Sequence, residues 1–421
     1  MKILVLYKAL WGQRELKQSV LDHLRMFDAA VDGKEVIYWN IADGVPAWLS
    51  RVECDAVVLH TTLLSVRYGA KSLYEYFRKQ LKWMESDTTI KIAFPQDERY
   101  FSSYLQDWLN SLAGVVHLYS IFGARENTRL QIYPQLSSEI KIYPCLTGYI
   151  SQRDLSEPTT EFNSRNYDIL YRAKKLPPWV GRYGQLKTKI AEELKRVSNK
   201  LPLKINSSVE TSDILLGRNW IQAMRDSKYL IACEAGGSAH DPEGQITEFA
   251  NKIKAHKGRF PSFAEIDDQF STEWDGHDFR AMGPKNLEAA ASKTCQILVE
   301  GEYGGILVPH RHYIPIKEDL SDLAEVLAAL TDSRGHEVAE RAYKEIALED
   351  SFSYRGFASE VVANVSKEIP LDTNTSRPKT SSFFTQFCAS LNGVCDRFPR
   401  LFSLPHLAKL WLIQTIADRS N

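Results

Sequence analysis

The sequence lacks several features that would place it in other protein classes. No apolar run approaches the ~18–20 residues that cross a membrane, and the apolar run at the N-terminus is shorter than the core of a signal peptide. The 52 basic and 53 acidic residues give a net charge of -1, which argues against a nucleic-acid binder that works by bulk charge. The six cysteines are scattered without a CxxC pair, so no zinc site is indicated. We expect a cytoplasmic protein that holds no metal.

Apolar segments separated by amphipathic stretches recur along the chain. The first group of predicted strands covers residues 2–7, 35–39, 55–60, 90–95, 115–121 and 140–146. After a polar segment, the alternation restarts with strands at 167–173, 202–206, 228–234 and 296–299. Apolar strands without alternation are typical of parallel sheets covered on both faces. The predicted fold class is α/β, with two doubly wound (Rossmann-like) domains at 1–150 and 167–352 and a linker at 151–166.

The chain beyond residue 352 is predicted to contain a helix at 353–368 and then a linker with an amphipathic tail at 369–421. The stretch 383–413 combines aromatic and basic side chains, which suits a helix lying at a membrane interface. Pro399 and Pro405 would break that helix into short pieces. Two alternatives stay open: peripheral contact with the inner face of the membrane, and packing of the tail onto the folded body.

The most informative stretch is 278–309, where Gly283 and Pro284 precede a predicted helix and a strand follows. A helix N-terminus offers amides and the positive end of a dipole to an anion, and Lys285 adds a positive charge. Glu288 lies one turn into the helix, where a carboxylate opposes a phosphate but suits a vicinal diol. These residues indicate a site for a nucleotide diphosphate. An ordinary surface helix with a glutamate in its first turn is the alternative.

Further polar residues follow predicted strands, where doubly wound sheets bind their ligands. Arg172 ends one strand and Lys187 begins the next helix, so the two cations could neutralise a diphosphate leaving group. A solvated basic loop is the alternative. Gly236 and Gly237 follow the strand at 228–234 and would let the backbone approach a ligand closely, although glycines make any turn.

The first domain offers two candidate general bases. His60 ends the strand at 55–60, and Asp97 follows the strand at 90–95. Either side chain could deprotonate an acceptor hydroxyl if geometry brings it within ~3 Å. A helix cap or a buried polar network is the alternative for each residue. His310 and His312 lie two residues apart, but no third ligand has a recognisable spacing, so we predict no metal there.

Three segments together resemble a GT-B glycosyltransferase, namely 168–187 (DILYRAKKLPPWVGRYGQLK), 229–244 (YLIACEAGGSAHDPEG) and 284–294 (PKNLEAAASKT). More narrowly, the chain resembles the family-1/family-4-like transferases of bacterial surface-polysaccharide gene clusters. The segments FPQDERY and CLTGYI in the first half resemble the same group, so the resemblance covers roughly residues 1–365. The resemblance implies two domains facing each other across a cleft.

The resemblance also implies roles for individual residues. Glu288 would hold the ribose of the donor, while Lys285 and the amides between Gly283 and Asn286 would meet its phosphates. The pair that stabilises the departing diphosphate would be Arg172 and Lys187. The predicted helix at 353–368 would cross back onto the first domain, and no metal or cofactor beyond the nucleotide-sugar substrate would be needed.

The sequence departs from the family pattern at two places. Retaining family-4 enzymes carry two glutamates eight positions apart, but Arg280 stands eight positions before Glu288. The stereochemical outcome therefore stays open, and Arg280 is itself a candidate phosphate ligand. The polar segment 245–279 is longer than the usual connection and could be an acceptor loop or a mobile lid.

The functional prediction is a glycosyltransferase that moves a sugar from a nucleotide-sugar donor to a glycan or lipid-linked acceptor in surface polysaccharide synthesis, with no nucleic-acid partner. A non-catalytic nucleotide-binding partner of a polysaccharide assembly complex is one alternative. A nucleotide-sugar epimerase of the same fold is another. Hydrolysis of a nucleotide sugar without acceptor separates the first two hypotheses, and interconversion of the sugar nucleotide identifies the third.

Overall fold

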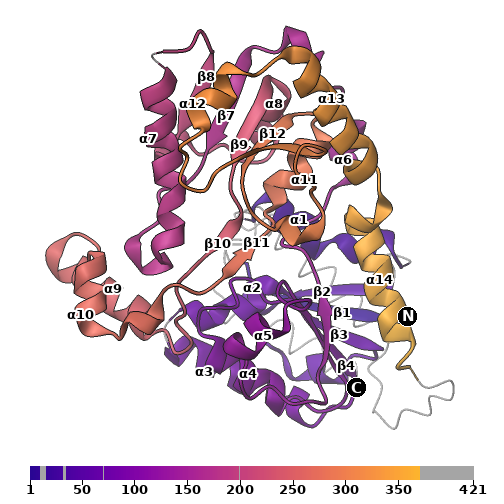
Figure 1. Ribbon diagram of the computed structural model, residues 1–421. Coiled ribbons are helices and arrows are strands. Elements are labelled where there is room, and N and C mark those ends of the chain that lie inside the picture. Colours follow the sequence, from indigo (N-terminus) through magenta and orange to yellow (C-terminus); the bar gives the residue numbers. More distant parts are fainter. Residues whose placement is uncertain (10–15, 32–34, 70, 199, 370–421) are drawn as a thin grey trace. The chain divides into compact units, whose positions relative to one another are not determined.

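The computed structural model describes residues 1–9, 16–31, 35–69, 71–198 and 200–369 (Figure 1). The chain divides into two compact units. Unit 1 contains Met1–Cys145 and the segment from Ala358 onward, and unit 2 contains Leu146–Phe357. Unit 2 is thus inserted between two parts of unit 1. The predicted domain limits at 150 and 352 lie close to these divisions. The predicted linker and tail at 369–421 lie outside the described residues, apart from residue 369. The candidate membrane stretch 383–413 is part of that tail.

Unit 1 is built on a six-stranded parallel sheet in the order β2-β1-β3-β4-β5-β6. Its strands are β1 (Ile3–Tyr7), β2 (Val36–Asn40), β3 (Ala56–Leu59), β4 (Ile90–Ala93), β5 (Val116–Ser120) and β6 (Lys141–Pro144). Every residue of the four central strands β1, β3, β4 and β5 is buried, so the sheet is covered on both faces, as the continuous apolar runs predict. The helices of this unit include α1 (Gln18–Leu24), α2 (Thr61–Leu64), α3 (Lys71–Gln80), α4 (Ser102–Ser111) and α5 (Glu126–Ile132).

Unit 2 is built on a five-stranded parallel sheet in the order β13-β12-β9-β7-β8. Its strands are β7 (Tyr167–Arg172), β8 (Ile205–Ser208), β9 (Ser227–Ala232), β12 (Cys295–Val299) and β13 (Tyr313–Ile316). An apolar cluster joins these strands to α7 (Leu186–Ser198), α12 (Leu323–Ala328) and α13 (Asp332–Ala342). Two further clusters join them to α8 (Arg218–Arg225) and α11 (Pro284–Ala291).

The two sheets share one topology. In each, the second strand pairs with one side of the first strand and the third strand pairs with the other side. The strand order therefore reverses between β1 and β3 in unit 1, and between β7 and β9 in unit 2. Open α/β sheets bind ligands at the carboxyl ends of the strands next to such a reversal. The predicted fold class, with two doubly wound Rossmann-like domains, is confirmed.

The helices follow the sequence periodicity that predicts them. In α7 the buried residues are Leu186, Ile190, Leu194 and Val197, and their spacing of three or four places them on one face of the helix. This face packs against the sheet of unit 2, which fixes the start of α7 beside the end of β7. Within the described part of the chain, every helix is too short or too polar to span a bilayer.

A short antiparallel ribbon of β10 (Ala235–Gly237) and β11 (Phe279–Ala281) interrupts the doubly wound pattern of unit 2. The segment between its strands forms α9 (Gln245–Lys257) and α10 (Phe263–Gln269), which Figure 1 shows beside each other. Ala239, Ile246, Ile266 and Trp274 give this segment an apolar cluster of its own. The long polar segment 245–279 of the sequence is therefore folded around a small core.

The two ends of unit 2 are tied together. The backbone N–H of Ile150 donates to the carbonyl of Phe352 at 2.8 Å, and the N–H of Tyr354 donates back to Ile150 at 3.1 Å. The rings of Tyr149 and Phe357 stack at 4.3 Å between centroids. The helix predicted at 353–368 is present as α14 (Tyr354–Ser366), which begins in unit 2 and ends in unit 1.

The segment 151–166, predicted as a linker, contains structure that belongs to unit 2. It includes α6 (Gln152–Ser156), and Arg165 is 7% exposed. The Arg165 guanidinium donates to the carbonyls of Ser227 at 2.9 Å and Ser292 at 3.2 Å. Ser227 begins β9, and Ser292 lies shortly before β12. Buried polar contacts between segments far apart in the sequence leave no composition signal, so the polar stretch looks like a linker.

Candidate functional site

The candidate site lies in unit 2, at the carboxyl ends of β7 and β9. Arg172 is the last residue of β7, and its carbonyl accepts a hydrogen bond from Nζ of Lys285 at 3.3 Å. Lys285 is the second residue of α11, and Lys187 is the second residue of α7. Three residues predicted from two segments, 168–187 and 284–294, therefore lie at the point where the strand order reverses, which is where this fold class binds ligands.

The two lysines interact electrostatically. Burial and then the positive charge of Lys187 lower the pKa of Lys285 to about 8. The Cys233 thiol lies directly after β9. Burial raises the pKa of this thiol, and the positive charges of both lysines oppose that rise. Like charges held close to each other in a partly desolvated place repel. A bound anion would relieve this repulsion.

Two more polar atoms at this edge of the sheet are enclosed and without a hydrogen-bond partner in the described part of the chain. They are Nε of Arg172 and Oγ1 of Thr188, which is in the first turn of α7. The rest of the Arg172 guanidinium donates to the side chain of Asn206 on β8. The side chain of Arg172 is thus drawn toward β8, and the cation coupled to Lys187 is Lys285.

The start of α11 differs from the expectation of several amides open to a phosphate. The N–H of Gly283 donates to Oδ1 of Asn286 at 3.2 Å, and the N–H of Asn286 donates to the carbonyl of Gly283 at 3.1 Å. The Asn286 side chain is fully buried and donates to Gln296 on β12 at 2.9 Å. Gly283 and Asn286 therefore cap the N-terminus of α11, and the positive charge of the site comes from the lysines.

Glu288 is half-buried on α11 and accepts a hydrogen bond from the indole of Trp220 at 2.8 Å. Trp220 belongs to α8, 68 residues away in the sequence. This contact helps to fix the orientation of the Glu288 carboxylate. The sequence alone does not indicate the role of Trp220.

The glycines after β9 have a structural role. Gly236 has φ +94° and pairs with Arg280, and a Cβ added to it would lie 2.1 Å from the carbonyl oxygen of Phe279. The neighbouring Gly237 pairs with Phe279 in the same ribbon. The backbone of these glycines thus approaches β11 closely, whereas the sequence predicts a close approach to a ligand. Arg280 donates through Nε to Asp278, directly before β11, at 2.8 Å, so a neighbouring carboxylate partly neutralises its charge.

In unit 1, the two predicted bases are placed differently. His60 is 1% exposed, and its Nδ1 accepts from the N–H of Thr62 at 3.2 Å, capping α2. Burial, with a smaller effect of His23, holds the pKa of His60 well below its ordinary value. Asp97 is exposed in a left-handed backbone conformation, with φ +49°. Burial therefore counts against His60 as a base, while Asp97 is accessible.

Glu98 is a buried carboxyl that the sequence places next to Asp97 without indicating its surroundings. It accepts hydrogen bonds from Tyr133 at 2.7 Å, from Ser120 at 2.8 Å and from the N–H of Ile121 at 2.9 Å. Burial raises its pKa to about 7, although these hydrogen bonds favour the charged form. Ser120 ends β5 and Ile121 follows it, while Tyr133 directly follows α5. Glu98 therefore links the loop after β4 to the end of the next strand.

The chain matches no protein-family model and no curated protein. Among solved structures it is similar to HepE of Anabaena in complex with UDP and glucose, with a TM-score of 0.46 and 11% identity over 88% of this chain and 100% of that chain. It is also similar to an α-glucosyltransferase in complex with UDP and DNA containing an HMU base (TM-score 0.49, 11% identity, 87% of this chain and 99% of that chain). A third is TarM (TM-score 0.39, 11% identity, 82% of this chain and 57% of that chain). Identities and scores this low assign neither a family nor an activity.

Proposed function

We propose that the chain is a glycosyltransferase that takes a sugar from a nucleotide-sugar donor and holds the diphosphate of that donor in unit 2, between Lys187 and Lys285. The observation that carries the proposal is the meeting of these two cations at the carboxyl ends of β7 and β9. Their repulsion in the free protein is relieved when an anion binds. Because the two ammonium groups supply the positive charge, the proposal needs no metal ion.

The proposed chemistry follows from where charge develops. As the bond between the sugar and the diphosphate breaks, negative charge grows on the departing phosphate oxygen. A positioned donor facing such an oxygen is worth about 3 kcal/mol. The ammonium groups of Lys187 and Lys285 supply that stabilisation. Glu288, oriented by Trp220, accepts hydrogen bonds from the ribose hydroxyls.

The acceptor half of the proposal comes from the sequence resemblance. The acceptor is a glycan or a lipid-linked sugar in the cytoplasm, used in surface polysaccharide synthesis. Its hydroxyl loses a proton as it attacks, and the exposed Asp97 of unit 1 is the candidate base because His60 is enclosed. The nucleotide-sugar half is supported by the geometry of unit 2.

The experiment that tests the donor site is a thermal-stability screen with nucleoside diphosphates and their sugars. A ligand at 100 times its dissociation constant adds about 2.7 kcal/mol to stability, so a selective rise in melting temperature is expected. The rise should be lost in Lys285→Ala and weakened in Glu288→Ala. Lys195→Ala is the matched control, because Lys195 is exposed in the last turn of α7.

The same ligands separate the proposal from its alternatives. A nucleotide sugar that stabilises the protein should also be hydrolysed slowly without acceptor, releasing the nucleoside diphosphate. Binding without release would favour a non-catalytic nucleotide-binding protein, and interconversion of the sugar an epimerase. If no nucleotide raises the melting temperature, or if Lys285→Ala retains the full rise, the proposed donor site is wrong.

A further inference from the structure

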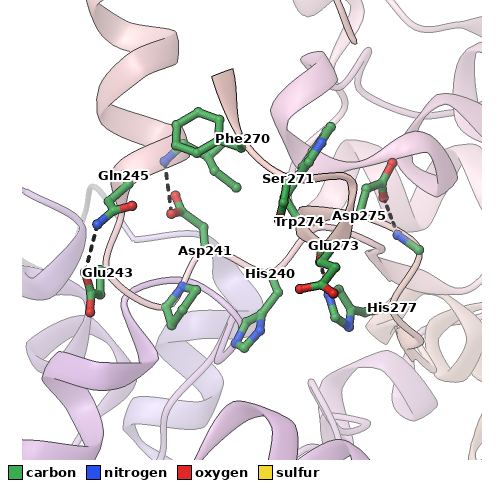
Figure 2. A pocket seen from close by; sticks show the side chains of 13 residues that line it. His240, Asp241, Glu243, Gln245, Phe270, Ser271, Glu273, Trp274, Asp275 and His277 are labelled. Carbon is green, nitrogen blue, oxygen red and sulfur yellow. Dashed lines mark hydrogen bonds between the residues drawn. The ribbon is translucent and has the colours of Figure 1, made fainter. Parts of the chain in front are cut away.

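A cavity of about 620 Å³ lies in the segment between β10 and β11 (Figure 2). One wall consists of the loop from His240 to Glu243 with the start of α9, and the other consists of the stretch from Phe270 to His277. This volume is within the ~300–1,000 Å³ typical of small-ligand sites. Except for the loop from His240 to Glu243, its lining belongs to the segment 245–279, which the sequence sets apart as longer than the family pattern. The donor site does not use this cavity.

The charge of the cavity excludes anionic ligands. Four of its lining residues are acids, namely Asp241, Glu243, Glu273 and Asp275, and none of the described residues that line it is a lysine or an arginine. A phosphate or carboxylate would be repelled by these groups. The cavity therefore differs in chemistry from the Lys187–Lys285 site, and it cannot serve as a second diphosphate site.

A metal ion also fits poorly, because three of the four carboxylates have other partners. Glu243 accepts a hydrogen bond from Nε2 of Gln245 at 2.9 Å. Asp241 is 2% exposed and accepts from the N–H groups of Ile246 at 3.1 Å and Thr247 at 2.8 Å, which holds the start of α9. Asp275 forms an ion pair with Arg182 at 2.9 Å. Among the described residues, no three His, Cys, Asp or Glu side chains are grouped in a way that could hold a metal.

The remaining polar groups suit hydroxyls. Nε2 of His240 is enclosed and has no hydrogen-bond partner in the described part of the chain, and Figure 2 shows this ring beside His277 in the cavity wall. Burial lowers the pKa of His240 to about 4, so its ring is neutral at pH 7 and can donate or accept. Nε2 of His277 pairs with the carbonyl of Glu273 at 2.7 Å. A hydroxyl, which both donates and accepts, matches a neutral imidazole and nearby carboxylates.

We propose that this cavity binds an uncharged saccharide, with hydroxyls hydrogen-bonded to Glu243, Glu273 and Nε2 of His240. The rings of His277 and Phe270 provide faces for the sugar. Since the proposed function is transfer to a glycan, the saccharide bound here is part of the acceptor, and that assignment rests on the proposed function. The binding itself does not, because no nucleotide takes part in it.

The test is calorimetric titration of the full chain, without nucleotide, against three kinds of probe. The neutral probes are maltohexaose, cellohexaose and chitohexaose, the acidic probe is an oligogalacturonate, and the cationic probe is spermidine. We expect at least one neutral oligosaccharide to bind and the acidic one to fail. A hydrogen bond to a charged group is worth about 1.5–3 kcal/mol, so Glu273→Gln should weaken binding roughly tenfold or more. Glu248→Gln is the matched control, because Glu248 lies on α9 and pairs with Lys252.

Each other outcome overturns the proposal. Binding of spermidine alone would make the cavity a site for cations, and binding of the oligogalacturonate alone would contradict the charge argument. If no neutral oligosaccharide binds, or if Glu273→Gln and Glu248→Gln bind equally well, the cavity is not a saccharide site. The thermal-stability screen with nucleotides, repeated on Glu273→Gln, distinguishes the two proposals. If the variant keeps the full rise in melting temperature with nucleotide, a failure of saccharide binding does not affect the proposed donor site.

Discussion

At the scale of single residues, burial decides which of the sequence's candidates can act. Lys285 and Lys187 are half-buried and coupled, whereas His60 is enclosed and caps a helix. Sequence motifs identify both lysines, because each opens a helix directly after a strand or a glycine-rich turn. They cannot reveal that the side chain of Asn286 is hydrogen-bonded to Gln296, because that contact depends on how α11 packs against β12.

The lowered pKa of Lys285 predicts how diphosphate binding depends on pH. The ammonium form binds the anion, so affinity is full below pH 8 and falls as the pH rises through about 8. The fall should approach tenfold per pH unit, the most that one proton can produce. Titration calorimetry with a nucleoside diphosphate between pH 7 and 9.5 measures it.

Lys285→Arg is the control for this prediction, because a guanidinium stays charged throughout the range. The variant should bind with an affinity that changes little between pH 7 and 9.5. Equal pH dependence in wild type and Lys285→Arg would show that another group controls the binding, and would remove Lys285 from the phosphate site.

At the scale of elements, continuous apolar runs predict strands well and short polar or glycine-rich strands poorly. The predicted strands at 2–7, 55–60 and 228–234 lie within two residues of β1, β3 and β9. β8 begins three residues later than predicted, since its sequence, INSS, is polar. The ribbon of β10 and β11 is absent from the prediction because strands of three residues are too short to carry a periodic signal.

The ribbon gives a prediction at the same scale. Gly236→Ala should lower the free energy of unfolding, because its Cβ would lie 2.1 Å from the Phe279 oxygen at a φ of +94°. Gly258→Ala is the matched control, since Gly258 has φ +68° and no atom within 4 Å of an added Cβ. Overpacking should cost Gly236→Ala about 1–3 kcal/mol beyond the control, measured by urea unfolding. Equal losses would mean that the ribbon opens to accept a side chain.

At the scale of the whole molecule, the sequence predicts two domains of one fold class. The structure shows that the five strands of the unit 2 sheet follow the same order as the first five strands of the unit 1 sheet. Alternation of strands and helices predicts this architecture because each βαβ unit is local in sequence. The division of the chain is less local. Contacts such as those of Arg165 join residues 62 and 129 positions apart, and no window of sequence reports them.

The stability of the whole chain should depend on pH through Glu98 in unit 1. Its pKa is raised from 4.5 to about 7 in the folded protein, so its contribution is fully present below pH 4.5 and is lost as the pH rises through 7. The loss is on the order of 3 kcal/mol. Glu98→Gln should lack this loss, while Glu139→Gln, at an exposed position, should behave as wild type. Parallel unfolding curves for wild type and Glu98→Gln from pH 4.5 to 7.5 would contradict the prediction.

The tied ends of unit 2 have a consequence for how this chain can be handled. Ile150 is hydrogen-bonded to Phe352 and Tyr354, so the stretch from Leu146 to Phe357 leaves and rejoins the rest of the chain at neighbouring points. A segment with adjacent termini costs little loop-closure entropy when it is cut out, recloned or circularly permuted. Unit 2 is in this sense an insertion that can be separated from unit 1, and a polypeptide of residues 146–357 contains both proposed binding sites.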